Sequence, residues 1–288
     1  MKKPAYLTDD VIKRAVVNAL NEDLGGDDYA ANDITANLIP SETAAKATLI
    51  TREDMVVCGV DWVNCAFHTV NPDLQLEWQV GDGDFVSANS QLLEISGNAR
   101  AILTAERTAL NFLQTLSATA TQTHHYTQLI GHSKTQLLDT RKTLPGMRLA
   151  QKYAVLCGGG SNHRIGLFDA FLIKENHIAA CGSIAAAVAT ARSQVTDKRV
   201  EVEVESIEEL TQAIAAGADI VMLDNFPLHL IHEAVELAQG HCKLEVSGNI
   251  TDADLQLLAT TGVDFISSGA LTKSVQAIDL SLRLFMQL

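Results

Sequence analysis

The sequence lacks the features that mark secreted and membrane proteins. Its five cysteines are scattered, and no two stand at the spacing of a metal-binding pair. This usage indicates reduced thiols without a disulfide framework. The opening residues, MKKPAYLTDDVIKRAV, have two lysines but no apolar run behind them, so we expect no signal peptide. Because no stretch approaches the roughly 18 apolar residues of a membrane helix, we expect a soluble cytoplasmic protein.

Positive charge is also scarce. The chain has 21 lysines and arginines against 35 aspartates and glutamates, a formal net charge of -14. This balance argues against general binding to nucleic acid or to a membrane surface. It does not exclude one focused anion site, because a local cluster of cations sets its own field.

Such a cluster stands in the segment between Asp139 and Lys174, next to His163 and a run of three glycines at 158–160. Arginine binds two oxygens of a carboxylate or phosphate at once, and lysine supplies a compact charge. The cluster therefore predicts a small ligand with several anionic groups, either a dicarboxylic acid or a sugar with phosphate and pyrophosphate. Its six basic residues are Arg141, Lys142, Arg148, Lys152, Arg164 and Lys174.

Two alternatives apply to this segment. A solvated basic helix face would explain Arg148 and Lys152 well, but it explains cations that follow strands poorly. The glycine run is either a flexible loop or the stop of a helix.

The second half alternates short apolar segments, rich in β-branched residues, with segments of helical periodicity. This rhythm predicts a parallel sheet built of right-handed βα units, and a (β/α) barrel fits it better than an open sheet. Polar and charged residues fall where the strands end, which is the face that carries active sites in such barrels. The alternative is that these residues merely begin loops. The predicted strands are 135–140, 170–175, 200–205, 219–225, 243–248 and 264–269.

The first half has a different pattern. A helix follows a cap at Thr8 or Asp9, two segments alternate like antiparallel strands with Gly-Asp turns, and a long helical segment comes next. We therefore predict an α/β protein in which a sandwich-like α+β domain (1–117) precedes a barrel domain (118–288). A C-terminal helix is expected to pack back on the first domain.

Acidic residues occupy the strand ends as well. In VEVEVE, Glu201, Glu203 and Glu205 point to one face, and inward glutamates are costly unless cations or a metal compensate them. Glu203 and Asp224, on neighbouring strands, could bind Mg²⁺ directly or through water, or stabilise positive charge developing on a sugar. The alternative is an ion pair of Glu203 with Lys142 or Lys174, and both interpretations are compatible.

Glycine-containing turns end the last two predicted strands, at Ser247-Gly248-Asn249 and Ser267-Ser268-Gly269. Backbone N–H groups of such turns commonly form a phosphate site after the final strands of a barrel. Either tripeptide alone is a weak signal, and the pair in this position is a stronger one.

Several motifs together resemble the quinolinate phosphoribosyltransferase family. They are, in order, DTRKTLPGMR, GGGSNHRIGL, FLIKENHI, EVEVE, IVMLDNF, EVSGNI and ISSGALTKS, and NDITANLI and ERTALNFLQTLS extend the likeness into the first half. The resemblance implies a reaction aided by Mg²⁺. The ring nitrogen of quinolinate attacks the anomeric carbon of phosphoribosyl pyrophosphate, pyrophosphate leaves, and the carboxylate beside the nitrogen is lost as CO₂. The product is nicotinate mononucleotide, for de novo NAD synthesis.

The resemblance also implies roles for residues that match the motifs. Lys142 would lie near the anomeric carbon and pyrophosphate, whereas Glu203 and Asp224 would serve the ribose, the metal and the oxocarbenium-like transition state. Arg107, in ERTALN, would reach the site of the neighbouring subunit in an obligate homodimer. The implied substrate-binding residues are Arg107, Thr140, Arg141, His163, Arg164, Lys174, Ser247, Gly248, Asn249, Ser268, Gly269 and Lys273.

Within that set, Arg141, His163, Arg164 and Lys174 would hold the quinolinate carboxylates and nearby phosphate oxygens. The two glycine-containing turns would receive the 5′-phosphate. Lys273 stands where several family members have histidine, and either side chain would contact phosphate or pyrophosphate.

Two rival functions stay open. A related phosphoribosyltransferase could use nicotinate, but the paired arginines would then lack a second carboxylate to bind. A non-catalytic barrel could hold a phosphorylated metabolite, and loss of Lys142, Glu203 or Asp224 would have favoured it.

Overall fold

The computed structural model describes residues 2–287, and their contacts define two compact units. The first unit contains the chain through His124, residues 144–159, and the chain from Ser274 onward. The second contains residues 125–143 and 160–273. The two units are thus interleaved along the chain rather than consecutive.

The first unit is built on a four-stranded antiparallel sheet with the order β12-β1-β5-β3. Two further short strands, β2 and β4, pair with each other in an antiparallel ladder. Thr8 caps the first helix, as predicted. The strands are β1 (Ala44–Thr51), β2 (Met55–Val56), β3 (Gln75–Trp78), β4 (Phe85–Val86), β5 (Gln91–Asn98) and β12 (Leu280–Gln287). The helices are α1 (Asp9–Leu24), α2 (Tyr29–Asn32), the 3₁₀ helix η1 (Ala36–Leu38), α3 (Val60–Val70), α4 (Ala99–Ile130) and α5 (Arg148–Cys157). Residues 125–130 of α4 belong to the second unit.

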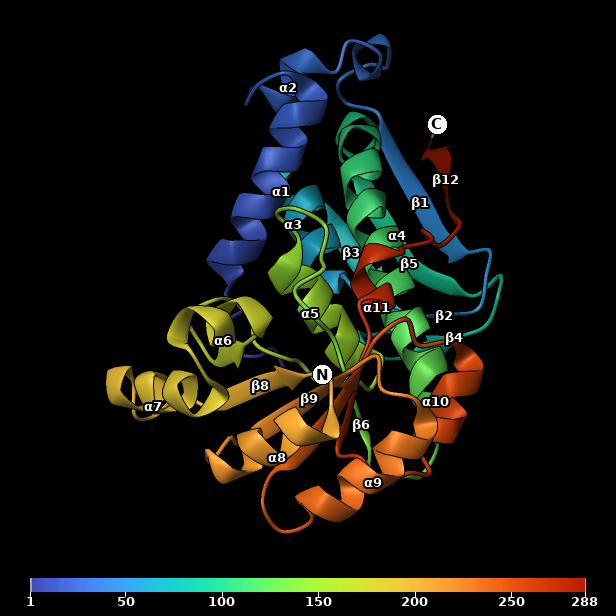
Figure 1. The fold of residues 1–288 in the computed structure, drawn as a ribbon. Helices are drawn as coiled ribbons and strands as arrows, with labels where there is room; N and C mark the ends of the chain where they lie inside the picture. Colours follow the sequence, from blue (N-terminus) through green and yellow to red (C-terminus); the bar gives the residue numbers. More distant parts are fainter. Residues whose placement is uncertain (1, 288) are drawn as a thin grey trace. The chain divides into compact units, whose positions relative to one another are not determined.

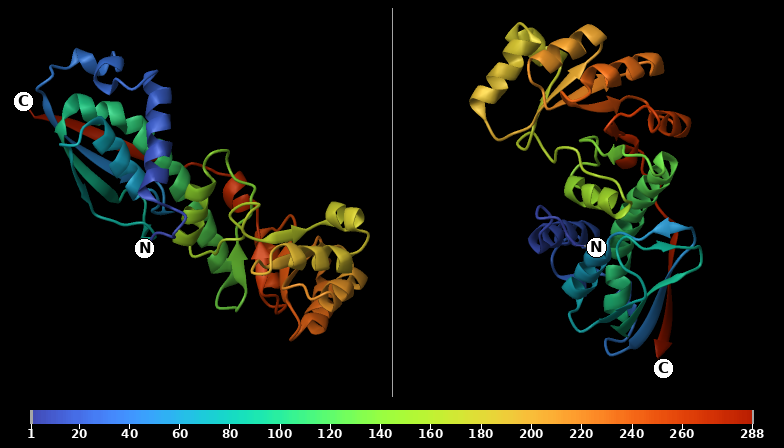
Figure 2. Two further views of the ribbon diagram at one scale, coloured as in Figure 1. Left: turned by 90° about the vertical axis from the view of Figure 1, so that its left-hand side faces the viewer. Right: turned by 90° about the horizontal axis from the view of Figure 1, so that it is seen from below.

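The predicted C-terminal helix is wrong. Residues 280–287 form strand β12, which pairs antiparallel with β1 from Thr51↔Leu280 to Ala44↔Gln287. Figure 2 shows this red strand beside the blue and green elements of the first unit. The segment LSLRLFMQ alternates apolar and other residues, and Leu280, Leu282 and Leu284 pack against the core. That period of two indicates a strand, as the structure has it.

The interpretation of Arg148 and Lys152 as part of a solvated basic helix face is wrong for Lys152, which lies in helix α5. Lys152 has 0% exposure, so it does not lie on a solvated helix face. Its neighbours Ala150, Tyr153 and Ala154 belong to the main core cluster, because α5 is buried over most of its surface. The helix ends at Gly158, where a Cβ atom would lie 2.3 Å from the Ala120 carbonyl oxygen. The glycine run is therefore the stop of a helix.

The second unit contains a six-stranded parallel sheet with the order β6-β11-β10-β9-β8-β7. Figure 1 shows its helices along the strands, and α7, α8 and α9 contact β8, β9 and β10. The strands are β6 (Gln136–Leu138), β7 (Phe171–Ile173), β8 (Val200–Val204), β9 (Ile220–Asp224), β10 (Lys243–Ser247) and β11 (Phe265–Ser267). The helices are α6 (Glu175–Cys181), α7 (Ile184–Gln194), α8 (Ile207–Ala215), α9 (Leu228–Ala238), α10 (Asp252–Leu258) and α11 (Ala270–Lys273).

The predicted closure of this sheet into a barrel is not seen. In the described part of the chain, β6 and β7 are edge strands and do not pair with each other. The free edge of β6 is taken by Ser161, whose N–H donates to the Leu137 carbonyl (2.8 Å) and whose carbonyl accepts from Asp139 (3.2 Å). The segment that returns from α5 therefore lies where β7 would have to pair.

The parallel sheet has an apolar face and a polar face. Along β10, Leu244 and Val246 alternate with Lys243, Glu245 and Ser247, so the latter three share one face. Because α9 contacts β10, the apolar side chains have a helix to pack against. Among residues 2–287, no helix has both the length and the apolar character needed to cross a membrane.

Candidate active site

The carboxyl ends of the parallel strands surround a cavity of about 320 Å³. Leu172 and Met222 contribute apolar walls. Ser267, from the predicted turn at 267–269, and Glu245, which was not predicted, also line the cavity. The predicted residues that line it are Thr140, Arg141, Lys142, His163, Arg164, Lys174, Glu203 and Ser247.

Lys142 is held on both sides. Its backbone N–H donates to the Thr140 hydroxyl (3.1 Å), and its carbonyl accepts from the Thr272 hydroxyl (2.7 Å). Its side chain runs past Gly269, where a Cβ atom would lie 2.8 Å from Lys142 Cδ. Gly269 thus makes room for the lysine, and Thr272 is a supporting residue that the sequence did not indicate.

Lys174 and Glu203 form an ion pair across the ends of β7 and β8. Lys174 Nζ lies 2.5 Å from Glu203 Oε2, and the glutamate side chain is only 11% exposed. The predicted alternative of a pair between Glu203 and Lys174 is therefore confirmed. The pair compensates the charge of an inward-facing glutamate, as burial of a carboxylate requires.

Buried Asp139 brings the segment after α5 back to the cavity. Its two carboxylate oxygens accept from the Asn162 side chain (2.6 Å) and from the His163 backbone N–H (2.9 Å). Arg164 follows directly and donates to the Ala170 carbonyl (3.4 Å). Because Asp139 directly follows β6, this aspartate links the end of that strand to the segment that carries His163 and Arg164.

The arginines of the cavity influence each other. Burial lowers the pKa of the Arg164 guanidinium, and the charge of Arg141 lowers it further, whereas Glu201 and Asp169 raise it. Two guanidinium groups near one another in a partly buried site favour an anionic ligand between them.

Both ring nitrogens of His163 have partners. Nδ1 accepts from the backbone N–H of Arg164 (2.8 Å), and Nε2 lies 2.9 Å from Glu201 Oε2 and 3.5 Å from Glu245 Oε2. A backbone N–H can only donate, so the neutral ring carries its proton on Nε2 and donates a hydrogen bond from Nε2 to Glu201. The ring thus connects a buried pair of carboxylates to the backbone of Arg164.

Glu245 is a fully buried acid of the site, with 0% exposure. Its pKa is raised to about 8, first by burial and then by the charge of Glu201, whereas His163 and Ser267 oppose the shift. Sequence reasoning missed this residue. The available signal was the alternation of Lys243, Glu245 and Ser247 within an otherwise apolar strand.

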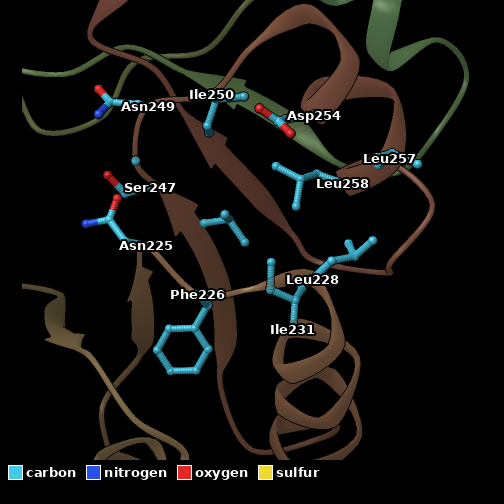
Figure 3. A pocket seen from close by; sticks show the side chains of 12 residues that line it. Asn225, Phe226, Leu228, Ile231, Ser247, Asn249, Ile250, Asp254, Leu257 and Leu258 are labelled. Atoms are coloured by element: carbon cyan, nitrogen blue, oxygen red, sulfur yellow. The ribbon is translucent and has the colours of Figure 1, made fainter.

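A second cavity of about 270 Å³ lies beside the turn that follows β10. Figure 3 shows Asn225, Ser247 and Asn249 on one side of it and the side chains of Leu228 and Leu258 on the other. The turn approaches the preceding strand closely. Gly248 has φ 153°, and a Cβ there would lie 2.9 Å from Asn225 Oδ1. The predicted turn at 247–249 therefore borders both cavities through Ser247.

Matches to family models cover most of the chain. The model of the quinolinate phosphoribosyl transferase C-terminal domain matches residues 119–283, and that of the N-terminal domain matches residues 33–117. The chain belongs to the quinolinate phosphoribosyl transferase family. The resemblance noted from the motifs is thus confirmed.

Individual members of this family are similar over nearly the full length. A solved structure of the nicotinate-nucleotide pyrophosphorylase from Francisella tularensis is 52% identical, with a TM-score of 0.94, and the match covers 99% of this chain and 100% of that one. The chloroplastic nicotinate-nucleotide pyrophosphorylase [carboxylating] of Arabidopsis thaliana is 40% identical over 99% of this chain and 85% of its own. The probable Bacillus subtilis enzyme of that name is 38% identical over 89% of each chain.

The other predicted site residues, which include Asp224, Ser268, Lys273 and Arg107, do not line the main cavity. Asp224 ends β9 opposite Ser247 in the ladder and accepts from the Asn225 side chain (2.9 Å). The Ser268 hydroxyl accepts from the Ala270 N–H (3.3 Å), and Lys273 is exposed at the end of α11. Arg107 is exposed on α4 in the first unit, whereas the cavity belongs to the second.

Glu203 and Asp224 suit a magnesium ion only together with a substrate. Among residues 2–287, clusters of three or more potential metal ligands form at Cys58-Asp82-Cys157 and His163-Glu201-Glu245, and neither includes Glu203 or Asp224. Magnesium is commonly held by one or two carboxylates plus substrate phosphates rather than by an all-protein cage. The two carboxylates fit that second pattern, and thiolates do not suit magnesium.

Proposed function

We propose that the chain transfers the phosphoribosyl group of phosphoribosyl pyrophosphate to quinolinate with decarboxylation, giving nicotinate mononucleotide, pyrophosphate and CO₂ in de novo NAD synthesis. One observation carries the proposal: Arg141, Lys142, Arg164 and Lys174 line a single cavity in an acidic chain of this family. Each hydrogen bond to a charged group contributes roughly 1.5–3 kcal/mol. Such a set of cations suits a dicarboxylate together with a polyphosphorylated sugar.

The reaction depends on position and charge. The ring nitrogen forms a bond to the anomeric carbon while the bond from that carbon to pyrophosphate breaks. Lys142 stabilises the leaving oxygens, and Glu203 stabilises positive charge that develops on the ribose. The carboxylate beside the nitrogen then leaves as CO₂, and the ring carbon takes up a proton. No activated nucleophile is needed for any of these steps.

The substrate-binding roles follow from the position of each group. Arg141 and Arg164 bind the quinolinate carboxylates as two-pronged donors, and Lys174 adds a point charge next to Glu203. The turns at 247–249 and 268–269 receive the 5′-phosphate through backbone N–H groups. Lys273 follows the second turn and is exposed, and its side chain contacts the phosphate or pyrophosphate group of the substrate from the solvent side.

Asp224 and Glu203 would hold a magnesium ion, directly or through water, together with the phosphates of phosphoribosyl pyrophosphate. When bound, the ion would neutralise phosphate charge and so ease departure of pyrophosphate. Lys174 already compensates Glu203, so Asp224 is the more available carboxylate.

Assembly completes the proposal. Arg107 reaches the site of a neighbouring subunit in a homodimer, which its exposure on α4 permits. The cytoplasmic location stays a prediction.

A comparison of acceptors tests the function. Purified protein is incubated with phosphoribosyl pyrophosphate, Mg²⁺ and either quinolinate or nicotinate, and mononucleotide formation is followed. Product from quinolinate but not from nicotinate is expected. Product from nicotinate alone would retain the phosphate site but overturn the dicarboxylate role of the arginines. No product from either, in a folded protein, would favour a binding protein for a phosphorylated metabolite.

A further inference from the structure

Glu245 lies in the shared wall of two cavities, at a depth that excludes water. It lines the main cavity of about 320 Å³ and also a third cavity, of about 230 Å³, that extends toward the amino ends of the strands. It has 0% exposure, and in the described part of the chain neither carboxylate oxygen has a hydrogen-bond partner. A carboxylate that is ionised and unpartnered at this depth would be very costly.

A count of protons shows how this cost is avoided. The ligand atoms of His163, Glu201 and Glu245 all lie within 4.8 Å of one another. The His163 ring contributes one proton, on Nε2, and donates a hydrogen bond through it to Glu201 at 2.9 Å. Two carboxylates this close, out of water, do not both ionise. A second proton therefore resides in the cluster, and Glu245, which receives no hydrogen bond, is the group that carries it.

A metal ion does not replace this proton. Coordination through Nε2 of His163 would move the ring proton to Nδ1. There it would face the backbone N–H of Arg164, which already donates to Nδ1 at 2.8 Å. Two N–H donors would then face each other. The arrangement therefore suits a proton and not a metal ion.

The groups around Glu245 come from every adjacent element. Glu201 faces it from β8, Ser267 from β11, and His163 with Arg164 from the segment that returns from α5. Met222 on β9 is apolar and is the ladder partner of Glu245. On β10 itself, Lys243 and Ser247 share its face toward the two ends of the strand. The other cations of the main cavity are Arg141, Lys142 and Lys174.

We propose that Glu245 is a positioning residue that must stay a neutral acid for the dicarboxylate substrate to bind, and this inference rests on the proposed function. Loss of its proton would place a second negative charge beneath a cavity that binds a dianion. The new charge would repel the substrate, and it would compete with Glu201 for the Nε2 proton of His163. Since His163 Nδ1 holds the backbone of Arg164, the arginine would lose its fixed position.

The inference predicts an alkaline limit to binding. Glu245 is protonated below about pH 8 and loses its proton above it. Binding that requires one bound proton weakens by about tenfold per pH unit once that proton is lost. The affinity for a dicarboxylate should therefore be flat below this pH and fall above it.

Calorimetric titrations with quinolinate and with benzene-1,2-dicarboxylate test this limit. The second ligand lacks the ring nitrogen and cannot be ribosylated, so binding is separated from reaction. Wild-type protein should show the alkaline fall in affinity with both ligands. Glu245→Gln, a neutral group of the same shape, should bind at neutral pH within about threefold of wild type and should lose the alkaline fall. The matched control Glu233→Gln, exposed on α9, should keep it.

Four outcomes would overturn the inference. The alkaline fall could persist in Glu245→Gln, or the folded variant could bind neither ligand at any pH. If that variant fails to fold, infrared spectra of the wild type decide instead, since a carboxylic acid band must disappear as the pH passes about 8. A wild-type protein that binds neither dicarboxylate at any pH would overturn the proposed function first, and this inference with it.

Discussion

The side chain of Lys142 packs against the bare backbone of Gly269. A Cβ atom at position 269 would lie 2.8 Å from Lys142 Cδ and 3.5 Å from the Thr140 hydroxyl. Thr272 fixes the carbonyl of the same lysine at 2.7 Å. The turn after β11 therefore sets the direction of the lysine that we assign to the leaving group.

Gly269→Ala should displace Lys142 without unfolding the protein. The added methyl meets a flexible side chain, so the free energy of unfolding should change by no more than about 1 kcal/mol. Displacement of a positioned group by about 1 Å can cost on the order of 10²-fold in rate, so kcat should fall by about 10- to 100-fold. Gly81→Ala is the control, because its Cβ would meet Asp84 at an ordinary 3.7 Å. Wild-type kcat in the folded Gly269→Ala variant would contradict the relationship.

Lys142→Ala should lower turnover by about 10²–10³ while the fold is retained. The side chain is exposed at the cavity, so its loss leaves no buried gap. Steady-state kinetics with circular dichroism would measure both effects, and exposed Lys134→Ala is the control. A folded Lys142→Ala enzyme with normal kcat would remove Lys142 from the mechanism.

Asp224→Asn should weaken metal binding in the substrate complex. Mn²⁺ can replace Mg²⁺ as a paramagnetic probe, and water-proton relaxation reports its binding without any turnover. With phosphoribosyl pyrophosphate present, the variant should bind Mn²⁺ about tenfold more weakly, within the range seen when a supporting group of a metal site is removed. Glu203→Gln should have a smaller effect, because Lys174 already pairs with Glu203. Equal binding by wild type and Asp224→Asn would refute the metal role of Asp224.

Mixed subunits test the contribution of Arg107. If this arginine serves the neighbouring site, an Arg107→Ala subunit and an Arg141→Ala subunit together form one intact site. Mixing the two inactive proteins under conditions of subunit exchange should restore part of the activity. Heterodimers that form but stay inactive would count against a shared site.

The stability of the protein should depend on the proton of Glu245. Its ordinary pKa is 4.5 and its pKa in the fold is about 8, so the folded state binds more protons than the unfolded state between these values. The contribution of this group to stability is then fully present below about pH 4.5 and is lost as the pH rises through about 8. Urea unfolding from about pH 5 to about pH 8 should show a steeper loss for wild type than for Glu245→Gln. Parallel curves would show that Glu245 is ionised in the fold.

Much of the second unit could be predicted because its signals are local. The alternation of β-branched runs with helical segments is visible within a few residues, and each predicted strand from 135–140 to 264–269 is present in the sheet. Most of the charged residues at the strand ends line one cavity because parallel strands place their carboxyl ends at one edge, although Asp224 lies outside it. Their residue types, arginine and lysine above all, predict an anionic ligand.

The features that the sequence did not predict depend on contacts between segments distant in the chain. Ser161 bridges to β6 across the intervening helix α5. The local pattern of apolar residues therefore does not predict that the edge of β6 is occupied. The burial of Lys152 depends in the same way on what surrounds its helix. Glu245 was missed because a single acid in a strand looks like surface alternation, whereas both faces of a parallel sheet are covered.

The fate of one carboxyl group tests the central claim most directly. Quinolinate labelled with ¹³C in the carboxylate beside the ring nitrogen is incubated with the protein, phosphoribosyl pyrophosphate and Mg²⁺, and the label is followed by NMR and mass spectrometry. The account predicts that all of the released label appears as CO₂, in equal amount to pyrophosphate and mononucleotide, and that none stays in the nucleotide. Label retained in the nucleotide, or CO₂ released without pyrophosphate, would contradict it.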